Sequence, residues 1–382
     1  MVKYKKEVIN LKKVFRKLFK IFISLIILVS LVVGGYVVYL TCQYYRIENE
    51  MNYTNNIQSN NNELVQLNSE YTITSYNIGF GAYNHEFSFF MDSGEMLDGT
   101  KVSGTGSKAE SKEVVLSNTE GAINTIKDLN PDFMFFQEVD QKATRSHKVN
   151  QYIKLSDSFK DHNSIYTSNF HSGFLFYPLL DPHGKVESGI VTMANKKIEN
   201  VVRYKLEIDE SFPTKFFDLD RCFSVSYLPI EGSDKQLVLV NVHLSAYDKG
   251  GVYRSKQWKQ LNDFFVEEVN KGNYIVCGGD FNHDISNDLS FDGFPTIQKK
   301  PEWVYTLSDK DLVQNLGLNF RTAINVPTCR STDMPYIKGE NYTVVIDGFI
   351  TSSNVEVVFV ENIDVDFLYS DHNPVLMKFI LK

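Results

Sequence analysis

The sequence contains few cysteines, and their spacing matches no metal-binding motif. Four occur among 382 residues, at positions 42, 222, 277 and 329. This spacing excludes a zinc site built from paired cysteines, and buried single thiols are the simplest interpretation of the last three. The sequence does not decide whether Cys222 and Cys329 form a disulfide. The chain also lacks an internal repeat and a second linker, so one large domain is favoured over two.

An excess of positive charge is missing as well. The formal net charge is −8, and the first 20 residues hold eight basic residues and one glutamate, which leaves −15 for the remainder. Proteins that bind nucleic acids without sequence preference usually carry a basic stripe. The composition therefore argues against a polynucleotide as the main ligand, although metal ions in a cleft can invert the local field.

Residues 21–42 form an apolar run of 22 residues without a charge. At about 1.5 Å per residue, this run is long enough to cross the hydrocarbon core of a bilayer, about 30 Å. The basic residues precede it, which predicts a cytoplasmic N-terminus. We therefore expect a basic cytoplasmic tail at 1–20 and a single-pass anchor in the cell membrane at 21–42, with the rest of the chain outside the cytoplasm.

Two alternatives to an uncleaved anchor share its layout. A cleaved signal peptide is also basic and then apolar, but this run is long, and residues 36–43 offer no small-x-small cleavage site. Lipid attachment at Cys42 is disfavoured because bulky or branched residues precede it.

The remainder of the chain has the pattern of a tether and one folded domain. Residues 43–70 are rich in asparagine and are expected to form the tether, and the domain is expected at 71–382. We expect a long loop at 80–112, and helices at 115–129, before Asn130-Pro131, and at 254–269. Strands are expected at 71–79, 133–137, 188–193, 223–228, 237–244, 274–277, 344–350 and 374–381. Many strands with few helices indicate two stacked sheets covered by helices.

Two short motifs beside apolar runs carry most of the chemical information. The chain reads Gly-Gly-Asp-Phe-Asn at 278–282 and Tyr-Ser-Asp-His-Asn-Pro-Val at 369–375. Cleavage of a phosphate ester needs carboxylates for a divalent metal ion, an acid or base of tunable pKa, and neutral donors for phosphoryl oxygens. An Asp-His pair and an Asp-x-Asn supply all three, so together the motifs indicate phosphoester hydrolysis.

Further polar residues end or interrupt the expected strands at Asn77, Glu138, His243 and Asp347. With their neighbours they form the ordered motifs Ser-Tyr-Asn, Phe-Gln-Glu, Val-His-Leu, Gly-Asp-Phe-Asn, Ile-Asp-Gly-Phe and Ser-Asp-His-Asn-Pro-Val. In this order the motifs resemble those of the endonuclease/exonuclease/phosphatase superfamily, over residues 71–382. The resemblance implies a four-layer α/β/β/α sandwich of two mixed sheets flanked by helices, and metal-dependent phosphoester hydrolysis.

The resemblance also implies a role for each matching residue. Glu138 would be the main Mg²⁺ ligand with Asn77 beside it, and Asp371 a further metal or water ligand, with Mn²⁺ as a substitute ion. Asp280 would orient or deprotonate the attacking water, and Asn282 would donate to a nonbridging phosphate oxygen. His372 would contact the phosphate, Asp347 would fix its tautomer, and His243 would be a second phosphate or proton-transfer group.

Other residues are weaker candidates. For each of five possible substrate contacts, a surface or structural role is at least as plausible: Arg145, Arg221, Arg254, His171 and Glu187. The remaining histidines are expected to be solvated loop residues: His85, His147, His162, His183 and His283. Aromatic segments at 87–90 and 174–180 are candidates for the rim of a lipid or sugar-phosphate pocket, although such residues are often core.

Three functional hypotheses follow. The leading one is a membrane-tethered, Mg²⁺-dependent phosphodiesterase or phosphatase that acts on a lipid headgroup or another small phosphoester, without an obligate protein partner. The second is a cell-surface nuclease, and stronger DNA binding at low salt would favour it. The third is a noncatalytic binding module on the same fold, against which the joint presence of Glu138, Asp280 and His372 argues.

Overall fold

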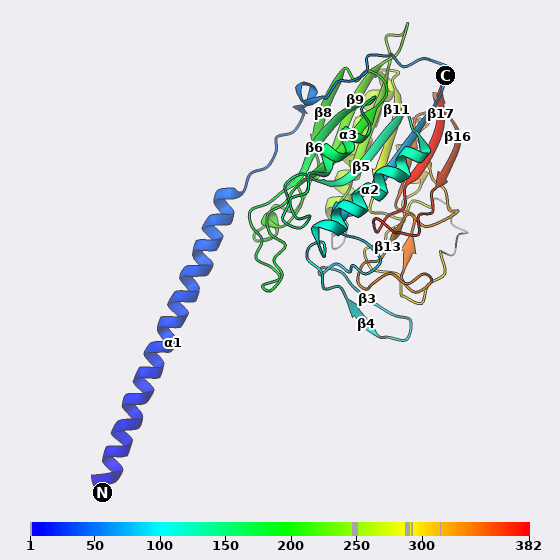
Figure 1. The fold of residues 1–382 in the computed structure, drawn as a ribbon. Coiled ribbons are helices and arrows are strands. Elements are labelled where there is room, and N and C mark those ends of the chain that lie inside the picture. Colours follow the sequence, from blue (N-terminus) through cyan, green and yellow to red (C-terminus); the bar gives the residue numbers. More distant parts are fainter. Residues whose placement is uncertain (1, 247–250, 287–290, 292, 314) are drawn as a thin grey trace. The chain divides into compact units, whose positions relative to one another are not determined.

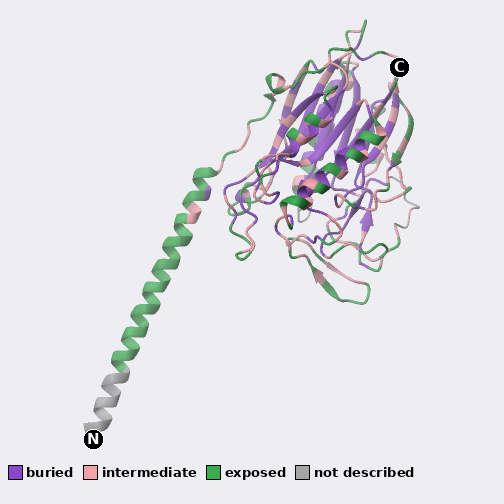
Figure 2. Cartoon of the chain, in the orientation of Figure 1, coloured by how far each residue is buried: buried purple, intermediate pink, exposed green. Residues whose placement is uncertain are grey.

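The structure, a computed structural model, describes residues 2–246, 251–286, 291, 293–313 and 315–382 (Figure 1). It divides into two compact units, Met1–Tyr45 and Arg46–Lys382. The first unit contains the helix α1 (Val2–Gln43). Within its part Lys12–Gln43, an 18-residue stretch has a mean hydropathy of 2.8, so this part is long and apolar enough to cross a membrane, a test that signal sequences near an N-terminus also pass. Figure 2 shows α1 from residue 12 onward almost entirely exposed.

Two large sheets form the centre of the second unit. The seven-stranded sheet has the spatial order β1 (Met51–Asn52), β8 (Asn200–Lys205), β9 (Cys222–Pro229), β10 (Gln236–His243), β11 (Tyr274–Asp280), β15 (Asp347–Thr351) and β12 (Asn319–Arg321). The six-stranded sheet has the order β16 (Val355–Asn362), β17 (Val375–Leu381), β2 (Glu70–Asn77), β5 (Phe133–Asp140), β7 (Glu187–Ala194) and β6 (Asn163–His171).

Shorter elements connect these strands. Two pairs of short strands lie outside the large sheets, β3 (Ser93–Glu95) with β4 (Lys101–Ser103), and β13 (Cys329–Arg330) with β14 (Thr343–Val344). The 3₁₀ turns are η1 (Thr54–Asn56), η2 (Gly79–Gly81), η3 (Thr214–Phe216) and η4 (Asp309–Asp311).

The two sheets pack face to face over one apolar layer. Phe133 and Phe135 of the six-stranded sheet belong to the same buried cluster as Leu239, Val276 and Phe349 of the seven-stranded sheet. Strand residues alternate between the two faces of a sheet, so the outer faces also carry apolar side chains and need a cover. Figure 2 shows the buried residues concentrated in the strands.

Helices cover both outer faces. The six-stranded sheet is covered by α2 (Lys112–Leu129) and α3 (Gln151–Ser158), which contribute Ile126 and Leu155 to a cluster with Phe136. The seven-stranded sheet is covered by α4 (Val252–Asn270), whose Leu261 and Phe265 pack on that sheet. The expected four-layer α/β/β/α sandwich is therefore confirmed.

Helix α2 ends where the sequence predicts. Ser111 caps its first turn by accepting a hydrogen bond from the backbone N–H of Val114, and Asn130 takes the left-handed conformation at its C-terminus. Pro131 follows and cannot continue a helix. Local sequence therefore fixes the length of this helix.

The asparagine-rich segment differs from a free tether. Residues 46–70 belong to the second unit, and β1 pairs with β8. The backbone N–H groups of Asn60 and Asn61 donate to the side chain of Asn163 at 2.6 and 2.9 Å. The side chain of Asn163 in β6 thus satisfies backbone groups of this segment, so the segment is bound to the domain.

Three smaller differences from the sequence expectations concern single elements. The strand expected at 344–350 is divided, because β14 ends at Val344 and β15 begins at Asp347. The loop expected at 80–112 contains the β3–β4 pair. All four cysteines are free, so Cys222 and Cys329 form no disulfide in this structure.

Candidate functional site

Strand register brings three of the predicted residues together at one end of the seven-stranded sheet. His243 is opposite Asp280 in the parallel pair β10–β11, and Asp280 is opposite Asp347 in the antiparallel pair β11–β15. Neighbouring strands lie about 4.8 Å apart, so the three residues form a row across adjacent strands.

Gly279 allows the close approach of these strands. Its φ is +142°, and a Cβ at this position would lie 2.1 Å from the carbonyl oxygen of Val242. Only glycine avoids both the backbone strain and this clash. The glycine therefore sets the position of the adjacent Asp280.

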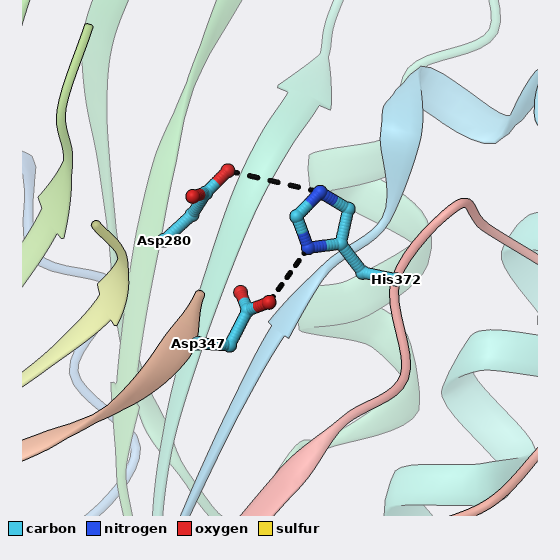
Figure 3. Close-up of side chains that lie close together, drawn as sticks. All are labelled: Asp280, Asp347 and His372. Atoms are coloured by element: carbon cyan, nitrogen blue, oxygen red, sulfur yellow. Dashed lines mark hydrogen bonds and ion pairs between the residues drawn. The ribbon is translucent and has the colours of Figure 1, made fainter. Parts of the chain in front are cut away.

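His372 lies between two carboxylates of this row, as Figure 3 shows. Its Nδ1 is 2.8 Å from Oδ2 of Asp347, and its Nε2 is 3.7 Å from Oδ2 of Asp280. All three side chains are buried. Because each ring nitrogen faces an acid, the arrangement orients the imidazole and favours its protonated form.

The six-stranded sheet contributes Asn77 and Glu138. Asn77 ends β2, and its Nδ2 lies 3.3 Å from Oε1 of Glu138 and 3.0 Å from Oδ2 of Asp280. Glu138 has a φ of +55°, at a register shift between Phe136 and Val139 that marks a β-bulge. Bulges re-aim side chains at the ends of strands, so the strained position is consistent with a functional carboxylate.

Asp371 joins the group through the residue before it. The hydroxyl of Ser370 donates to the backbone oxygen of Asn77 at 2.7 Å and to Oδ1 of Asp371 at 3.2 Å. The C-terminal motif is thereby attached to the end of β2. The sequence prediction did not single out Ser370, although it lies inside the quoted motif.

His243 and Asn282 complete the set of predicted residues. Nε2 of His243 lies 3.5 Å from Oδ2 of Asp280. Asn282 donates its backbone N–H to Oδ1 of Asp280 at 2.8 Å, and its side-chain nitrogen donates to the carbonyl oxygen of Leu244, also at 2.8 Å. One amide hydrogen of Asn282 is therefore used within the protein, and a second is left for another acceptor.

Burial and mutual charge shift the acid–base properties of these groups. Burial, with the charge of Asp347, raises the pKa of Asp280 to about 7, although His372 opposes this rise. Burial alone would lower the pKa of His372, but the surrounding groups, chiefly the charge of Asp347 with that of Asp371, together outweigh burial and hold that pKa well above its usual value. Burial and the positive charge of Arg221 hold the pKa of His243 well below its usual value. The two histidines thus favour opposite protonation states.

Two sets of donors in the site have the chemistry to bind a divalent cation. Ligand atoms of Asp280, Asp347 and His372 lie within 4.8 Å of one another. In this set, however, Nδ1 of His372 is already bound to Asp347, and a protonated imidazole is not a ligand. The acid–base arrangement therefore explains this cluster better than a metal ion does.

The second set consists of Glu138, Asn77 and Asp371. Burial raises the pKa of Glu138, and the charge of Asp371 raises it further, against the opposing charge of Arg145. Both residues are half-buried at this end of the sandwich. Hard cations such as Mg²⁺ prefer carboxylate and amide oxygens, and a cation would relieve the repulsion between the two acids. In this structure, the amide nitrogen of Asn77 faces Glu138, so its oxygen would have to turn to join the ligands.

The weaker candidates have structural partners. Arg145 is buried, pairs with Asp140 at 2.9 Å and stacks on Phe80 at 3.9 Å. Arg254 donates to the backbone oxygen of Trp303 at 2.8 Å. The others have protein contacts as well: Arg221 with the backbone oxygen of His243, His171 with Asp220, and Glu187 with His171 in the β6–β7 ladder.

Two of the histidines expected in solvent are buried, which makes that part of the prediction wrong. Nδ1 of His183 lies 2.6 Å from the backbone oxygen of Ser107, and Nδ1 of His283 lies 2.6 Å from that of Phe281. A loop position in the sequence does not reveal such long-range packing.

Sequence reasoning also missed a buried amide pair just below the site. Nε2 of Gln137 donates to Oδ1 of Asn241 at 2.8 Å, which links β5 to β10 across the two sheets. Gln137 directly precedes Glu138, and Asn241 lies two residues before His243. The pair therefore joins the two halves of the site, but no local pattern in the sequence indicates it.

Comparisons with known proteins agree with this architecture. A model of the Endonuclease/Exonuclease/phosphatase family matches residues 75–372. No curated protein matches the chain significantly.

Several solved structures share the fold. A protein of this family from Leptotrichia buccalis has 15% identity and a TM-score of 0.52, over 81% of this chain and 99% of that chain. The human Nocturnin catalytic domain with bound sulfate anion has 15% identity and a TM-score of 0.50, over 82% and 95%. ANGEL2, described as a 2′,3′-cyclic phosphatase, has 14% identity and a TM-score of 0.50, over 81% and 95%.

Proposed function

The chain belongs to the Endonuclease/Exonuclease/phosphatase family, and from this membership we propose a divalent-metal-dependent hydrolase of lipid-headgroup or other small phosphoesters, held at a membrane by α1. Members of the family hydrolyse phosphoester bonds and generally use divalent metal ions. The observation that carries the proposal is the meeting of Glu138, Asp280 and His372, which come from distant segments, at one end of the sandwich.

In the proposed site, Glu138, Asn77 and Asp371 would hold Mg²⁺, with Mn²⁺ as a substitute. When bound, such an ion polarises a phosphoryl oxygen and neutralises negative charge. Removing the charge of Glu138 should therefore abolish ion binding while the fold persists.

The remaining residues would manage protons and phosphate charge. Asp280 orients the attacking water and accepts its proton as the oxygen bonds to phosphorus and the ester bond breaks. His372, kept protonated by Asp347, donates from Nε2 to a phosphoryl or leaving oxygen. His243 is neutral at pH 7, and the second amide hydrogen of Asn282 donates to a nonbridging oxygen.

The acidity of the second unit supports a small or lipid phosphoester over duplex DNA. The chain beyond residue 20 carries −15, which repels a polyanion over most of the surface. The helix α1 and the basic residues before it support anchoring with a cytoplasmic N-terminus and an exported domain.

A substrate panel with one charge variant tests the proposal. The full chain in detergent is assayed on nitrophenyl phosphate, bis-nitrophenyl phosphate, sphingomyelin, phosphoinositides, plasmid DNA and RNA, with Mg²⁺, Mn²⁺ or chelator. Glu138→Gln should reduce turnover at least about a hundredfold without loss of folding. Glu199→Gln is the control, because Glu199 is exposed and its carboxylate contacts Lys197 and Gln236 at the surface.

Two results would contradict the proposal. Full activity in excess chelator would exclude the metal mechanism. Preference for plasmid DNA, with affinity that rises steeply as salt is lowered, would support a cell-surface nuclease instead.

A further inference from the structure

Two loops at the same end of the sandwich as the proposed site expose large apolar side chains. They are the β6–β7 connection, residues 172–186, and the β8–β9 connection, residues 206–221. Where the first connection enters β7, Ser188 pairs with Asp140 of β5. Where the second enters β9, Phe223 pairs with Val242 of β10. Asp140 and Val242 lie within two residues of Glu138 and His243, so both connections border the site.

The exposure of these loops is extreme for this domain. Among the described residues of the unit Arg46–Lys382, the four most exposed large apolar side chains are Leu180 at 100%, Leu179 at 82%, Tyr177 at 67% and Phe212 at 64%. All four lie on the two connections. Large apolar side chains exposed on loops at one end of a domain are typical of an interaction surface.

The exposed tip of the β6–β7 connection is held by an ordered base. Leu175 and Gly184 exchange backbone hydrogen bonds of 3.1 and 3.0 Å, and Leu175 is buried. The ring of Tyr177 lies 5.7 Å from that of Phe90, and His183 is buried beneath the tip. The apolar residues are therefore presented to the outside by a folded support.

The chain joins the domain beside the other loop. Nη2 of Arg46 donates to the backbone oxygen of Lys215 at 3.1 Å, and the backbone N–H of Ile47 donates to Asp220 at 2.9 Å. Helix α1 ends at Gln43. Two residues separate Gln43 from Arg46, and a linker of this length spans about 10 Å when extended. The first residues of the second unit, Arg46 and Ile47, thus contact the β8–β9 connection, and in the sequence they follow α1 after two residues.

We propose that the apolar tips of these two connections enter the interfacial region of the bilayer that α1 spans, so that the site faces the membrane and takes the phosphoester headgroups of bilayer lipids. This inference rests on the proposed function, because it names the substrate class of the same site. Tyrosine and phenylalanine suit this depth because an aromatic ring tolerates the boundary between headgroups and acyl chains. The two leucines add apolar area at the most exposed point.

A fluorescence experiment tests the membrane contact independently of activity. The full-length protein is reconstituted into phosphatidylcholine vesicles with or without acyl-brominated phosphatidylcholine. Leu180→Trp should give emission that brominated lipid quenches beyond the parent protein. Val358→Trp is the control, because Val358 is 46% exposed on β16, at the opposite edge of the six-stranded sheet from β6, and should show no added quenching. Equal quenching in the two variants, or none for Leu180→Trp, would overturn the contact.

An activity experiment tests the substrate class. The double variant Leu179→Ser/Leu180→Ser should hydrolyse sphingomyelin or phosphoinositide in vesicles at least about tenfold more slowly, with unchanged turnover of soluble bis-nitrophenyl phosphate. The double variant lies outside the proposed catalytic groups, and Val358→Ser is the matched control. Unchanged hydrolysis of bilayer lipid would refute this inference and leave the proposed function intact. Failure of the parent protein on every phosphoester would instead refute the proposed function, while the quenching result would still decide the membrane contact.

Discussion

Replacing Asp347 by asparagine tests the acid–base arrangement directly. The substitution keeps the shape of the side chain and removes the charge that lies 2.8 Å from Nδ1 of His372. Burial by itself lowers the pKa of His372, and Asp347 is the largest influence that raises it. The variant should therefore hold this histidine neutral at pH 7, without the proton that the proposed mechanism needs.

The magnitude follows from the geometry of the pair. Two unit charges 2.8 Å apart attract by about 6 kcal/mol at an effective dielectric constant of about 20, before the loss of hydration is counted. A hydrogen bond to a charged group contributes about 1.5–3 kcal/mol net. We expect a loss of about 3 kcal/mol of transition-state stabilisation, which is roughly a hundredfold fall in kcat at pH 7.

The kinetic assay compares Asp347→Asn, His372→Ala and the double variant over a range of pH. The acidic side of the profile should recover part of the activity of Asp347→Asn, because lower pH restores the proton to His372. Asp347→Asn should cost little more once His372 is gone, since the two side chains act as a unit. Single losses that multiply fully in the double variant, or near-normal turnover of Asp347→Asn, would refute the reasoning.

Stability supplies a second readout of the same pair. A raised pKa of His372 stabilises the fold, and this contribution is full below the unfolded-state pKa of about 6.5 and is lost as the pH rises through the folded-state pKa. The Asp347→Asn variant lacks this pH-dependent contribution to stability. Urea denaturation in chelator should therefore show a larger difference between parent and variant at pH 6 than at pH 10, where the parent has lost part of the contribution.

Three further predictions concern the scaffold and the topology. Gly279→Ala places a Cβ 2.1 Å from the backbone oxygen of Val242 and should lower the free energy of unfolding by about 3 kcal/mol. Gly232→Ala is the control, because Gly232 has a φ of +72° and open space around the new Cβ, and it should cost only about 1 kcal/mol. Equal losses of stability in urea denaturation would contradict the clash. Burial raises the pKa of the Cys222 thiol to about 11 and that of the Cys329 thiol to about 12. At pH 8, iodoacetamide should therefore label neither thiol in the native protein and both after unfolding, as measured by mass spectrometry. Rapid labelling of the native protein would contradict the burial. Protease added to intact cells should remove the domain, and protection until lysis would reverse the proposed topology.

The sequence predicted the polar residues of the site but not what brings them together. Asp280 and His372 stand out because a charged or titratable residue beside an apolar run is unusual. Their proximity depends on the order of the strands and on register, such as Asp280 opposite Asp347. Sheet order is a long-range property, which periodicity of 2 or 3.6 residues does not encode. The family resemblance supplied this information, because its motifs imply a known topology.

Elements stabilised mainly by distant partners were missed. β16 at the edge of its sheet was missed although four valines and a phenylalanine favour a strand; its burial follows no simple alternation, and Val358 and Phe359 are exposed. The segment 46–70 looks like a linker because asparagine disfavours regular structure, but Asn60 and Asn61 bind Asn163, more than 100 residues away. Composition describes what a segment does alone and not what it does against a partner.

Two of the positions where local rules fail lie in the proposed site. Glu138 and Asn282 both have positive φ, at +55° and +50°, a conformation that costs a non-glycine residue about 1 kcal/mol or more. Glu138 is a poor choice there for stability, because its carboxylate is also desolvated and lies near Asp371. The bulge in β5 turns this carboxylate toward Asn77 of β2, whose amide also contacts Asp280, an orientation that regular pleating does not give. The proposed binding of a cation and a phosphoester would account for backbone strain and repulsion between acids at one point, and the amide pair between Gln137 and Asn241 links the two sheets directly beneath it.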